Sequence, residues 1–130
     1  MNRVHNSMPP NVLIVDDSAA IRKILQRVLR QAEVPLGSLY EAGDGVQALE
    51  AMKNNSIDLV LSDINMPNMD GLQLLAQIRA NPQWHGVRVL MITTEGNQAR
   101  VMEAVGLGAA GYVRKPFTAD QIKEKVLSLM

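Results

Sequence analysis

The sequence contains no cysteine among its 130 residues, which excludes disulfide bonds and metal sites built from thiolates. Neither sign of charge is in excess, because 13 basic side chains balance 13 acidic ones, and this argues against a module that holds nucleic acid through bulk charge. No apolar run approaches the roughly 18 residues needed to span a membrane, and the N-terminus lacks the apolar core of a signal peptide. We therefore expect a cytoplasmic protein that binds neither nucleic acid nor membranes.

Hydrophobic residues make up 47% of the chain, so a domain of this length can bury a single core without cross-links. Residues 1–9 are polar, show no apolar pattern and run into a second proline, and we interpret them as a disordered extension. Residues 10–130 are expected to form one domain. The sequence stops after its last helical segment without a linker, so no output domain is expected.

Short apolar runs alternate along the chain with segments of helical periodicity. We expect strands at residues 11–15, 38–42, 59–62, 87–92 and 111–114. A helix is expected after each strand, the fourth at about 98–107 and the fifth opened by a capping box from Thr118 to Gln121. The expected core-facing positions of the other helical segments are Ile21, Ile24, Leu25, Val28 and Leu29; Val46, Leu49 and Met52; Leu74, Leu75 and Ile78; and Ile122, Val126 and Leu129. The basic residues of the first helix are expected to be solvated: Arg22, Lys23, Arg27 and Arg30.

This alternation predicts a doubly wound α/β domain, in which helices cover both faces of a parallel sheet. Polar groups follow four of the five strands: Asp16 with Asp17, then Asp63, Thr93 and Lys115. Because parallel strands end at the same edge of a sheet, these groups would meet at one site if strands one, three, four and five are neighbours. The residues alone do not establish that order.

The chemistry of this set can be argued from charge. Three carboxylates at one edge repel each other, and a hard divalent cation such as Mg²⁺ relieves this with oxygen ligands. Without cysteine or paired histidines, zinc and copper are poor alternatives. Lys115 would neutralise a phosphoryl group and Thr93 would donate a hydrogen bond to it, with Asp63 as the nucleophile. Each residue alone also fits a structural role, such as a helix cap, but four successive strand ends favour a site.

Four stretches resemble the response-regulator receiver family, most closely its single-domain chemotaxis regulators. They are residues 15–18 (VDDS), 62–71 (SDINMPNMDG), 93–95 (TTE) and 111–117 (GYVRKPF), and the resemblance covers residues 10–130. It implies a (βα)5 flavodoxin-like fold with the parallel strand order 2-1-3-4-5.

The resemblance also implies roles for the site residues. Asp63 would accept a phosphoryl group from a histidine kinase, and Lys115 would contact that group. Mg²⁺ would be bound by Asp17, Asp63 and the backbone carbonyl of Asn65, with Asp16 acting directly or through water. The peptide bond from Lys115 to Pro116 corresponds to one that is cis in the family.

A switch and an output face follow from the same resemblance. Thr93 and Tyr112 would form the switch pair, read out on the fourth helix, fifth strand and fifth helix by a target such as a flagellar switch protein. Asn65, Thr94 and Glu95 would tune dephosphorylation, and a phosphatase is a further candidate partner. We expect a monomer.

Three departures from the family pattern stand out. Ile64 occupies a position where some relatives have tryptophan. Thr94 stands where a small residue is common, and its bulk could narrow the access of water and slow dephosphorylation. Arg114 adds a positive charge to the output face, which bears on the identity of the partner.

Other functions compete with a chemotaxis switch. A single-domain phosphorelay intermediate or a regulator of another output would use the same residues, whereas a degenerate docking module would not need the intact set of acids, Thr93 and Lys115. An aspartate-nucleophile phosphohydrolase needs a second acid two residues after its nucleophile on the first strand. Here Ser18 stands two residues after Asp16, and 130 residues leave no room for a cap domain.

Overall fold

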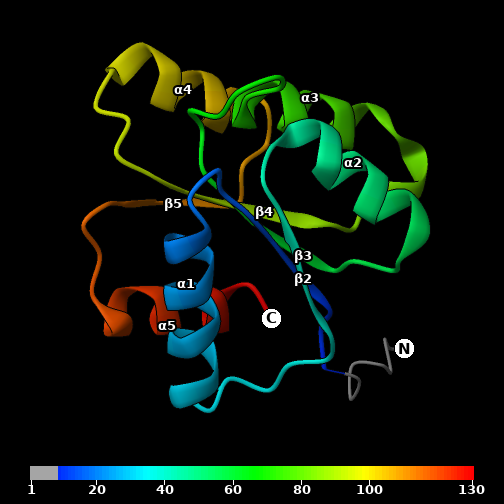
Figure 1. Ribbon diagram of the computed structural model, residues 1–130. Helices are drawn as coiled ribbons and strands as arrows, with labels where there is room; N and C mark the ends of the chain where they lie inside the picture. The colour runs from blue at the N-terminus through cyan, green and yellow to red at the C-terminus, as the bar shows by residue number, and fades with distance from the viewer. Residues whose placement is uncertain (1–8) are drawn as a thin grey trace.

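The computed structural model describes residues 9–130, so positions 1–8 of the expected extension lie outside the described residues. Five strands alternate with five α-helices and one 3-10 helix over this range (Figure 1). The strands are β1 Val12–Val15, β2 Leu39–Ala42, β3 Leu59–Ser62, β4 Arg88–Thr93 and β5 Gly111–Arg114. The helices are α1 Ala19–Gln31, α2 Gly45–Asn54, α3 Gly71–Ala80, η2 Pro82–Trp84, α4 Gln98–Gly106 and α5 Ala119–Ser128.

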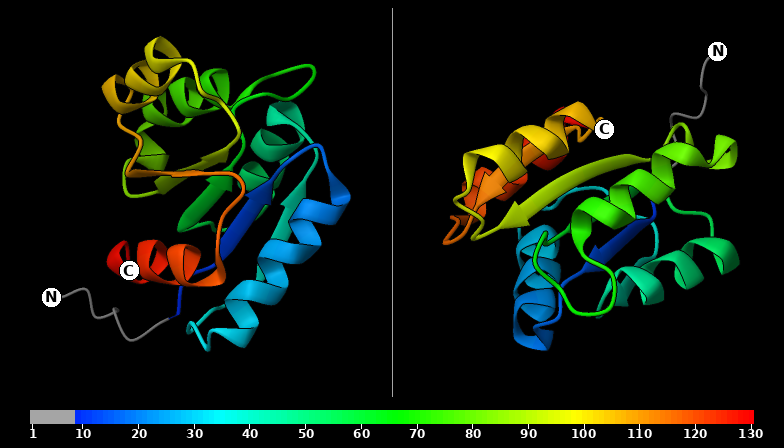
Figure 2. Two further views of the ribbon diagram at one scale, coloured as in Figure 1. Left: turned by 90° about the vertical axis from the view of Figure 1, so that its left-hand side faces the viewer. Right: turned by 90° about the horizontal axis from the view of Figure 1, so that it is seen from above.

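The strands form one parallel sheet in the order β2-β1-β3-β4-β5, as the family resemblance implies. Helices α1 and α5 cover one face, and α2, α3 and α4 cover the other (Figure 1 and Figure 2). The expected doubly wound architecture is confirmed. In the described part of the chain, no helix is both long and apolar enough to cross a membrane.

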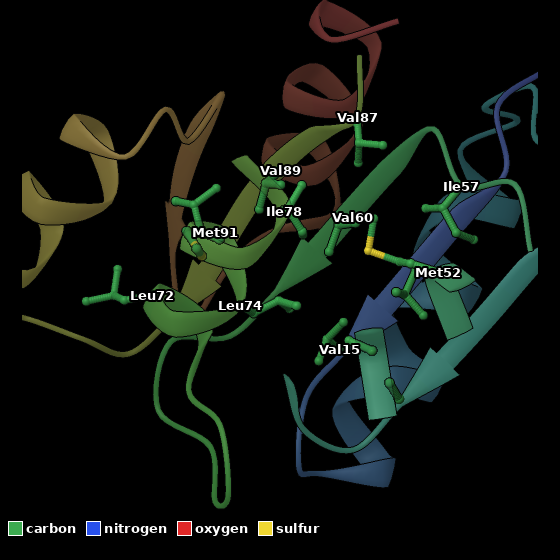
Figure 3. Close-up of a cluster of buried hydrophobic side chains, with 14 of the residues drawn as sticks. Val15, Met52, Ile57, Val60, Leu72, Leu74, Ile78, Val87, Val89 and Met91 are labelled. Atoms are coloured by element: carbon green, nitrogen blue, oxygen red, sulfur yellow. The ribbon is translucent and has the colours of Figure 1, made fainter. Parts of the chain in front are cut away.

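Successive apolar residues of β1, β3 and β4 enter opposite cores, which explains why these strands read as continuous apolar runs. Leu13 and Val15 pack beneath α2, α3 and α4, whereas Val12 and Ile14 pack beneath α1 and α5. Figure 3 shows the first of these cores, with strand valines and Met91 against helix residues such as Leu74.

Polar side chains cap the start of each α-helix by accepting a hydrogen bond from a backbone N–H of the first turn. The N-caps are Ser18, Asp44, Asp70, Asn97 and Thr118. The expected capping box at Thr118 and Gln121 is confirmed, and α3 has a second one. The α3 cap lies seven residues after Asp63, so Asp63 is not a helix cap.

Two expected core positions are wrong. Ile24 is 40% exposed, because the buried arc of α1 is centred on Leu25 and Leu29 and an adjacent residue is rotated by about 100°. Val46 is 53% exposed, because the inward-facing arc of α2 is formed by Gly45, Ala48 and Met52. Gly45 lets the start of α2 approach the β3–α3 loop closely, where its N–H donates to the carbonyl of Met69 over 3.0 Å.

The expected solvated face of α1 also needs correction at its first turn. Arg22 is only partly exposed and, together with Lys23, forms an ion pair with Glu41 of β2. Periodicity identifies the polar face of a helix but cannot show that a neighbouring strand supplies a partner for it.

Candidate functional site

The carboxyl ends of β1, β3, β4 and β5 are neighbours, which brings the expected site residues to one edge of the sheet. Asp16 directly follows β1, Asp63 directly follows β3, and Lys115 directly follows β5. Thr93 is the last residue of β4 and is fully buried. The sequence alone did not establish whether these four strands are neighbours, and the structure shows that they are.

Asp16, Asp17 and Asp63 each offer a carboxylate oxygen within 4.8 Å of the other two. Asp16 and Asp63 are buried, Asp63 with 8% of its surface exposed, whereas Asp17 is open to solvent. All of the donors are hard oxygens, and the open side leaves room for water ligands. This set fits Mg²⁺, which retains several waters when bound by a few carboxylates.

Lys115 lies against two of these acids. Its Nζ is 2.7 Å from Asp16 Oδ2 and 3.2 Å from Asp63 Oδ2. Burial by itself would lower the pKa of Lys115, but the hydrogen bond to Asp16 and the charges of both acids outweigh it and raise the pKa above its usual value. The ammonium is thus held charged beside the carboxylate of Asp63. The Lys115–Pro116 peptide bond is cis, as the resemblance implies.

Backbone groups fix the two buried carboxylates. Asp16 Oδ1 accepts from the N–H of Ser18 at 2.9 Å, and Asp63 Oδ1 accepts from the N–H of Ile64 at 2.6 Å. The N–H of Asp63 in turn donates to the carbonyl of Val15 over 3.0 Å. Each carboxylate is therefore oriented by a backbone N–H that lies just beyond the strand preceding it.

The start of α3 packs directly on the strand end of Asp63. The N–H of Gly71 donates to the carbonyl of Ile64 over 2.7 Å. A Cβ atom at Gly71 would lie 2.1 Å from the carbonyl oxygen of Asp63, so no side chain fits there without moving backbone. Ile64 itself is fully buried in the core beneath α2, α3 and α4.

The β3–α3 loop, which carries the exposed Asn65, is tied to the start of α2. Asn68 has a left-handed backbone with φ 67° and donates to Asp44 Oδ2 over 2.7 Å. The N–H of Gln47 and the amide of Asn68 stabilise the Asp44 carboxylate and hold its pKa below the usual range. The hydrogen bond between Asn68 and Asp44 was not predicted from the sequence, because 24 positions separate the two residues and Asp44 belongs to no recognised motif.

Glu95 lies in the loop between β4 and α4. Its carboxylate accepts from the N–H of Asn97 at 2.9 Å and from Arg100 Nε at 3.0 Å. The Asn97 hydrogen bond lowers the pKa of Glu95 against the effect of burial, with help from Asn65 and Arg100. Asn65 is therefore close enough to Glu95 to influence its carboxylate, whereas Thr94, the third residue expected to tune dephosphorylation, is exposed.

Arg100 is a further site residue that the sequence reasoning missed. It also reaches Asp70 Oδ2 at 3.4 Å, so it joins the start of α4 to the cap of α3. A cation in the first turn of a helix opposes the helix dipole, and this placement is a signal that could have revealed a carboxylate partner.

Tyr112 and Thr93 both form a hydrogen bond with the backbone of Glu95, one with its carbonyl and the other with its N–H. The Tyr112 hydroxyl donates to the carbonyl of Glu95 over 2.6 Å, and Thr93 Oγ1 accepts from the N–H of Glu95 at 3.1 Å. The Tyr112 ring is half-buried against the core beneath α2, α3 and α4. The expected switch pair is thus physically linked through one loop.

Residues 12–127 match the family model described as the response regulator receiver domain. The chain belongs to this family. Its members are signalling proteins rather than classical enzymes.

Chemotaxis proteins are among the relatives that this chain resembles. The chain is 42% identical over 115 residues to chemotaxis protein CheY-3 of Vibrio cholerae, covering 88% of this chain and 87% of that protein. It is 39% identical to chemotaxis protein CheY of Pseudomonas aeruginosa, covering 88% and 91%. Among solved structures, a CheX-CheY-BeF3-Mg²⁺ complex from Borrelia burgdorferi contains a chain that is 32% identical, with a TM-score of 0.85 and coverage of 97% and 92%.

Proposed function

We propose that this receiver domain is a phosphorylation-dependent switch that accepts a phosphoryl group on Asp63 and acts in chemotaxis. The observation that carries the proposal is the position of the Asp63 carboxylate, which is 3.2 Å from Lys115 and within 4.8 Å of the oxygens of Asp16 and Asp17. No structural requirement of the fold explains three acids and a partly buried lysine at one point. The chemotaxis part rests on the similarity to CheY proteins.

In the proposed reaction, a carboxylate oxygen of Asp63 attacks the phosphorus of a phosphohistidine on a histidine kinase. A new P–O bond forms an acyl phosphate, and the P–N bond breaks with its electron pair passing to the imidazole. Mg²⁺ bound by Asp16, Asp17, Asp63 and the carbonyl of Asn65 would supply charge neutralisation at the transferring group. Lys115 adds a second positive charge, and Thr93 offers a hydroxyl donor.

The switch would begin at Thr93. Turning its hydroxyl toward the phosphoryl group changes the bond that Thr93 Oγ1 accepts from Glu95, and Glu95 is also the acceptor for Tyr112. Movement of this loop therefore reaches β5 and α4. The face formed by α4, β5 and α5 exposes Met102, Val105 and Arg114. We propose this face as the binding surface for a downstream target such as a flagellar switch protein.

We further propose a cytoplasmic monomer, with a receiver domain over residues 10–130 and an extension at 1–9. A histidine kinase is the proposed phosphodonor, and a phosphatase is a candidate third partner. The Borrelia relative, which was solved in a complex with CheX and Mg²⁺, supports both a protein partner and this cofactor. Asn65, Thr94 and Glu95 remain our candidates for residues that set the lifetime of the acyl phosphate.

Intact mass after incubation with a small phosphodonor and Mg²⁺ tests the proposal. We expect wild type to gain one phosphoryl group, and Asp63→Asn or added EDTA to prevent the gain. Asp120→Asn, which changes an exposed acid of α5, is the matched control and should be modified like wild type. A wild-type chain that stays unmodified, or an Asp63→Asn chain that is modified equally, contradicts the proposal.

Binding to flagellar switch proteins tests the chemotaxis part. Immobilised switch protein should retain the phosphorylated wild type more strongly than the unphosphorylated chain or Asp63→Asn. Retention that does not depend on phosphorylation would count against a motor role, even if Asp63 is the phosphoacceptor.

A further inference from the structure

We propose that Arg22 is a positioning residue for the metal site, which fixes the peptide between Asp16 and Asp17 and is itself aligned by Glu41. This inference rests on the proposed binding of Mg²⁺ at the three acids. It assigns a function to a side chain in the first turns of α1 that lies outside the acidic cluster.

Arg22 makes two directed contacts with its guanidinium. Nη1 donates to the backbone carbonyl of Asp16 over 2.5 Å, and Nε donates to Glu41 Oε1 over 2.9 Å. The side chain is 19% exposed, so these contacts are partly shielded from water. Because the guanidinium is planar and rigid, fixing Nε against β2 also fixes the direction in which Nη1 points.

The contact with Asp16 bears on Asp17 through the peptide plane. The carbonyl oxygen of Asp16 and the N–H of Asp17 belong to one planar unit, so holding that oxygen sets the direction in which the chain enters Asp17. Asp16 and Asp63 have other restraints, since backbone N–H groups and Lys115 hold their carboxylates. The side chain of Asp17 makes no hydrogen bond with the described residues and is exposed, so its backbone is what directs it.

Glu41 is suited to hold Arg22 at any physiological pH. Its carboxylate also accepts from Lys23 Nζ at 2.9 Å, and the hydrogen bonds from Lys23 and Arg22 lower the pKa of Glu41 to about 2. Lys23 has a side chain that is 64% exposed and contacts the same carboxylate without reaching Asp16. Binding α1 to β2 needs only such an ion pair. A purely structural role for Arg22 does not explain why its second donor, Nη1, binds the carbonyl of Asp16 at the acidic cluster.

Electrostatics and positioning predict opposite effects of removing Arg22. Loss of a cation near three acids should strengthen Mg²⁺ binding if charge alone matters, because like charges repel. Loss of an alignment contact should weaken it, and removal of such supporting contacts typically costs about tenfold or more in metal affinity. Lys23→Met removes the same charge from the same helix turn and therefore controls for the electrostatic effect.

Calorimetric Mg²⁺ titration of the full chain, with urea unfolding to confirm that each variant is folded, tests the inference. We expect Arg22→Met to raise the Kd for Mg²⁺ by about tenfold, Arg22→Lys to recover little of this loss, and Lys23→Met to leave the Kd at or below the wild-type value. Glu41→Gln should weaken binding by a smaller factor, and it replaces Arg22→Met if that variant does not fold.

A double-mutant cycle with Asp17 separates positioning from general destabilisation. In an Asp17→Ala background, Arg22→Met should have little further effect on the Kd, because the residue through which it acts is gone. A folded Arg22→Met variant with wild-type Mg²⁺ affinity, or an equal loss with Lys23→Met, overturns the inference. A wild-type chain that binds no Mg²⁺ overturns the metal site of the proposed function as well.

Discussion

The hydroxyl of Tyr112 donates a 2.6 Å hydrogen bond to the carbonyl of Glu95, which ties β5 to the loop that follows Thr93. The N–H of the same glutamate donates to Thr93 Oγ1 over 3.1 Å. A movement of Thr93 at the buried end of β4 can therefore be transmitted to the Tyr112 ring through Glu95 alone. This short link explains how a local event at the acidic cluster could alter the α4–β5–α5 face.

Replacing Tyr112 with phenylalanine should loosen this loop while leaving the ring packed. We expect the free energy of unfolding to fall by about 1 kcal/mol, the typical value of one hydrogen bond, and amide exchange at residues 95–97 to become faster. Urea unfolding and hydrogen exchange measure these effects. Tyr40→Phe is the control, because Tyr40 is also partly buried against the same core and its hydroxyl makes no hydrogen bond with the described residues. Unchanged exchange in Tyr112→Phe would show that the bond does not restrain the loop.

Replacing Lys115 with methionine should separate metal binding from phosphoryl transfer. The ammonium lies 2.7 Å from Asp16 and 3.2 Å from Asp63, where it competes with any cation for the two carboxylates. We expect Mg²⁺ affinity to rise on the order of tenfold after screening, while phosphorylation of Asp63 slows. Titration and intact mass measure the two effects, with Lys125→Met of α5 as the control for loss of one charge. Weaker Mg²⁺ binding in Lys115→Met would mean that Lys115 supports the metal site instead.

Low pH should destabilise the fold, over a pH range that is set in part by the titration of Glu41. Its pKa is lowered from 4.5 to about 2 by the hydrogen bonds from Lys23 and Arg22. A lowered folded-state pKa means that the stabilisation is complete above about pH 4.5 and is lost as the pH falls toward 2. Asp44 and Glu95, whose pKa values are also lowered, act in the same direction.

The measurement is the urea midpoint as a function of pH between 6 and about 3, within the window where carboxylates titrate. Glu41→Gln should lose stability at neutral pH and show a shallower decline than wild type on acidification. Glu50→Gln, at an exposed position of α2, should follow the wild-type curve. Parallel curves for Glu41→Gln and wild type would show that the ion pair does not stabilise the fold.

The sequence was sufficient to predict the elements and the edge at which the chemistry gathers. Continuous apolar runs such as residues 59–62 mark strands buried on both faces, and the polar residues after them mark the shared edge. Strand order came from the family resemblance, because periodicity carries no information on which strands are neighbours. The confirmed order is what places Thr93 and Lys115 beside Asp63.

The errors and omissions share a physical cause, which is that they depend on contacts between distant segments. Val46 has the hydrophobicity of a core residue, yet the close approach of Gly45 to Met69 turns it outward. Arg22 and Arg100 look like ordinary helix-surface cations until Glu41 and Asp70 are placed beside them. Which distant acid pairs with each cation is set by the tertiary fold and cannot be read from the neighbouring sequence.

Gly71 provides the sharpest test of how the fold positions the proposed phosphoacceptor. A methyl group at this position would lie 2.1 Å from the carbonyl oxygen of Asp63 and 2.9 Å from the Cα of Ile64, both of which are backbone atoms that cannot rotate away. Gly71→Ala must therefore shift the start of α3 or the end of β3. We expect a loss of about 1–3 kcal/mol in the free energy of unfolding and slower phosphorylation of Asp63.

Gly106→Ala is the matched control, because a Cβ at this α4 position meets no atom within 4 Å. It should raise the free energy of unfolding by about 0.4–1 kcal/mol, since alanine loses less backbone entropy than glycine on folding, and it should leave phosphorylation unchanged. Urea unfolding and intact mass compare the two variants with wild type. If Gly71→Ala matched wild type in both measurements, the close contact between α3 and Asp63 would not be what holds the carboxylate, and the backbone bonds from Ile64 and Val15 would be sufficient.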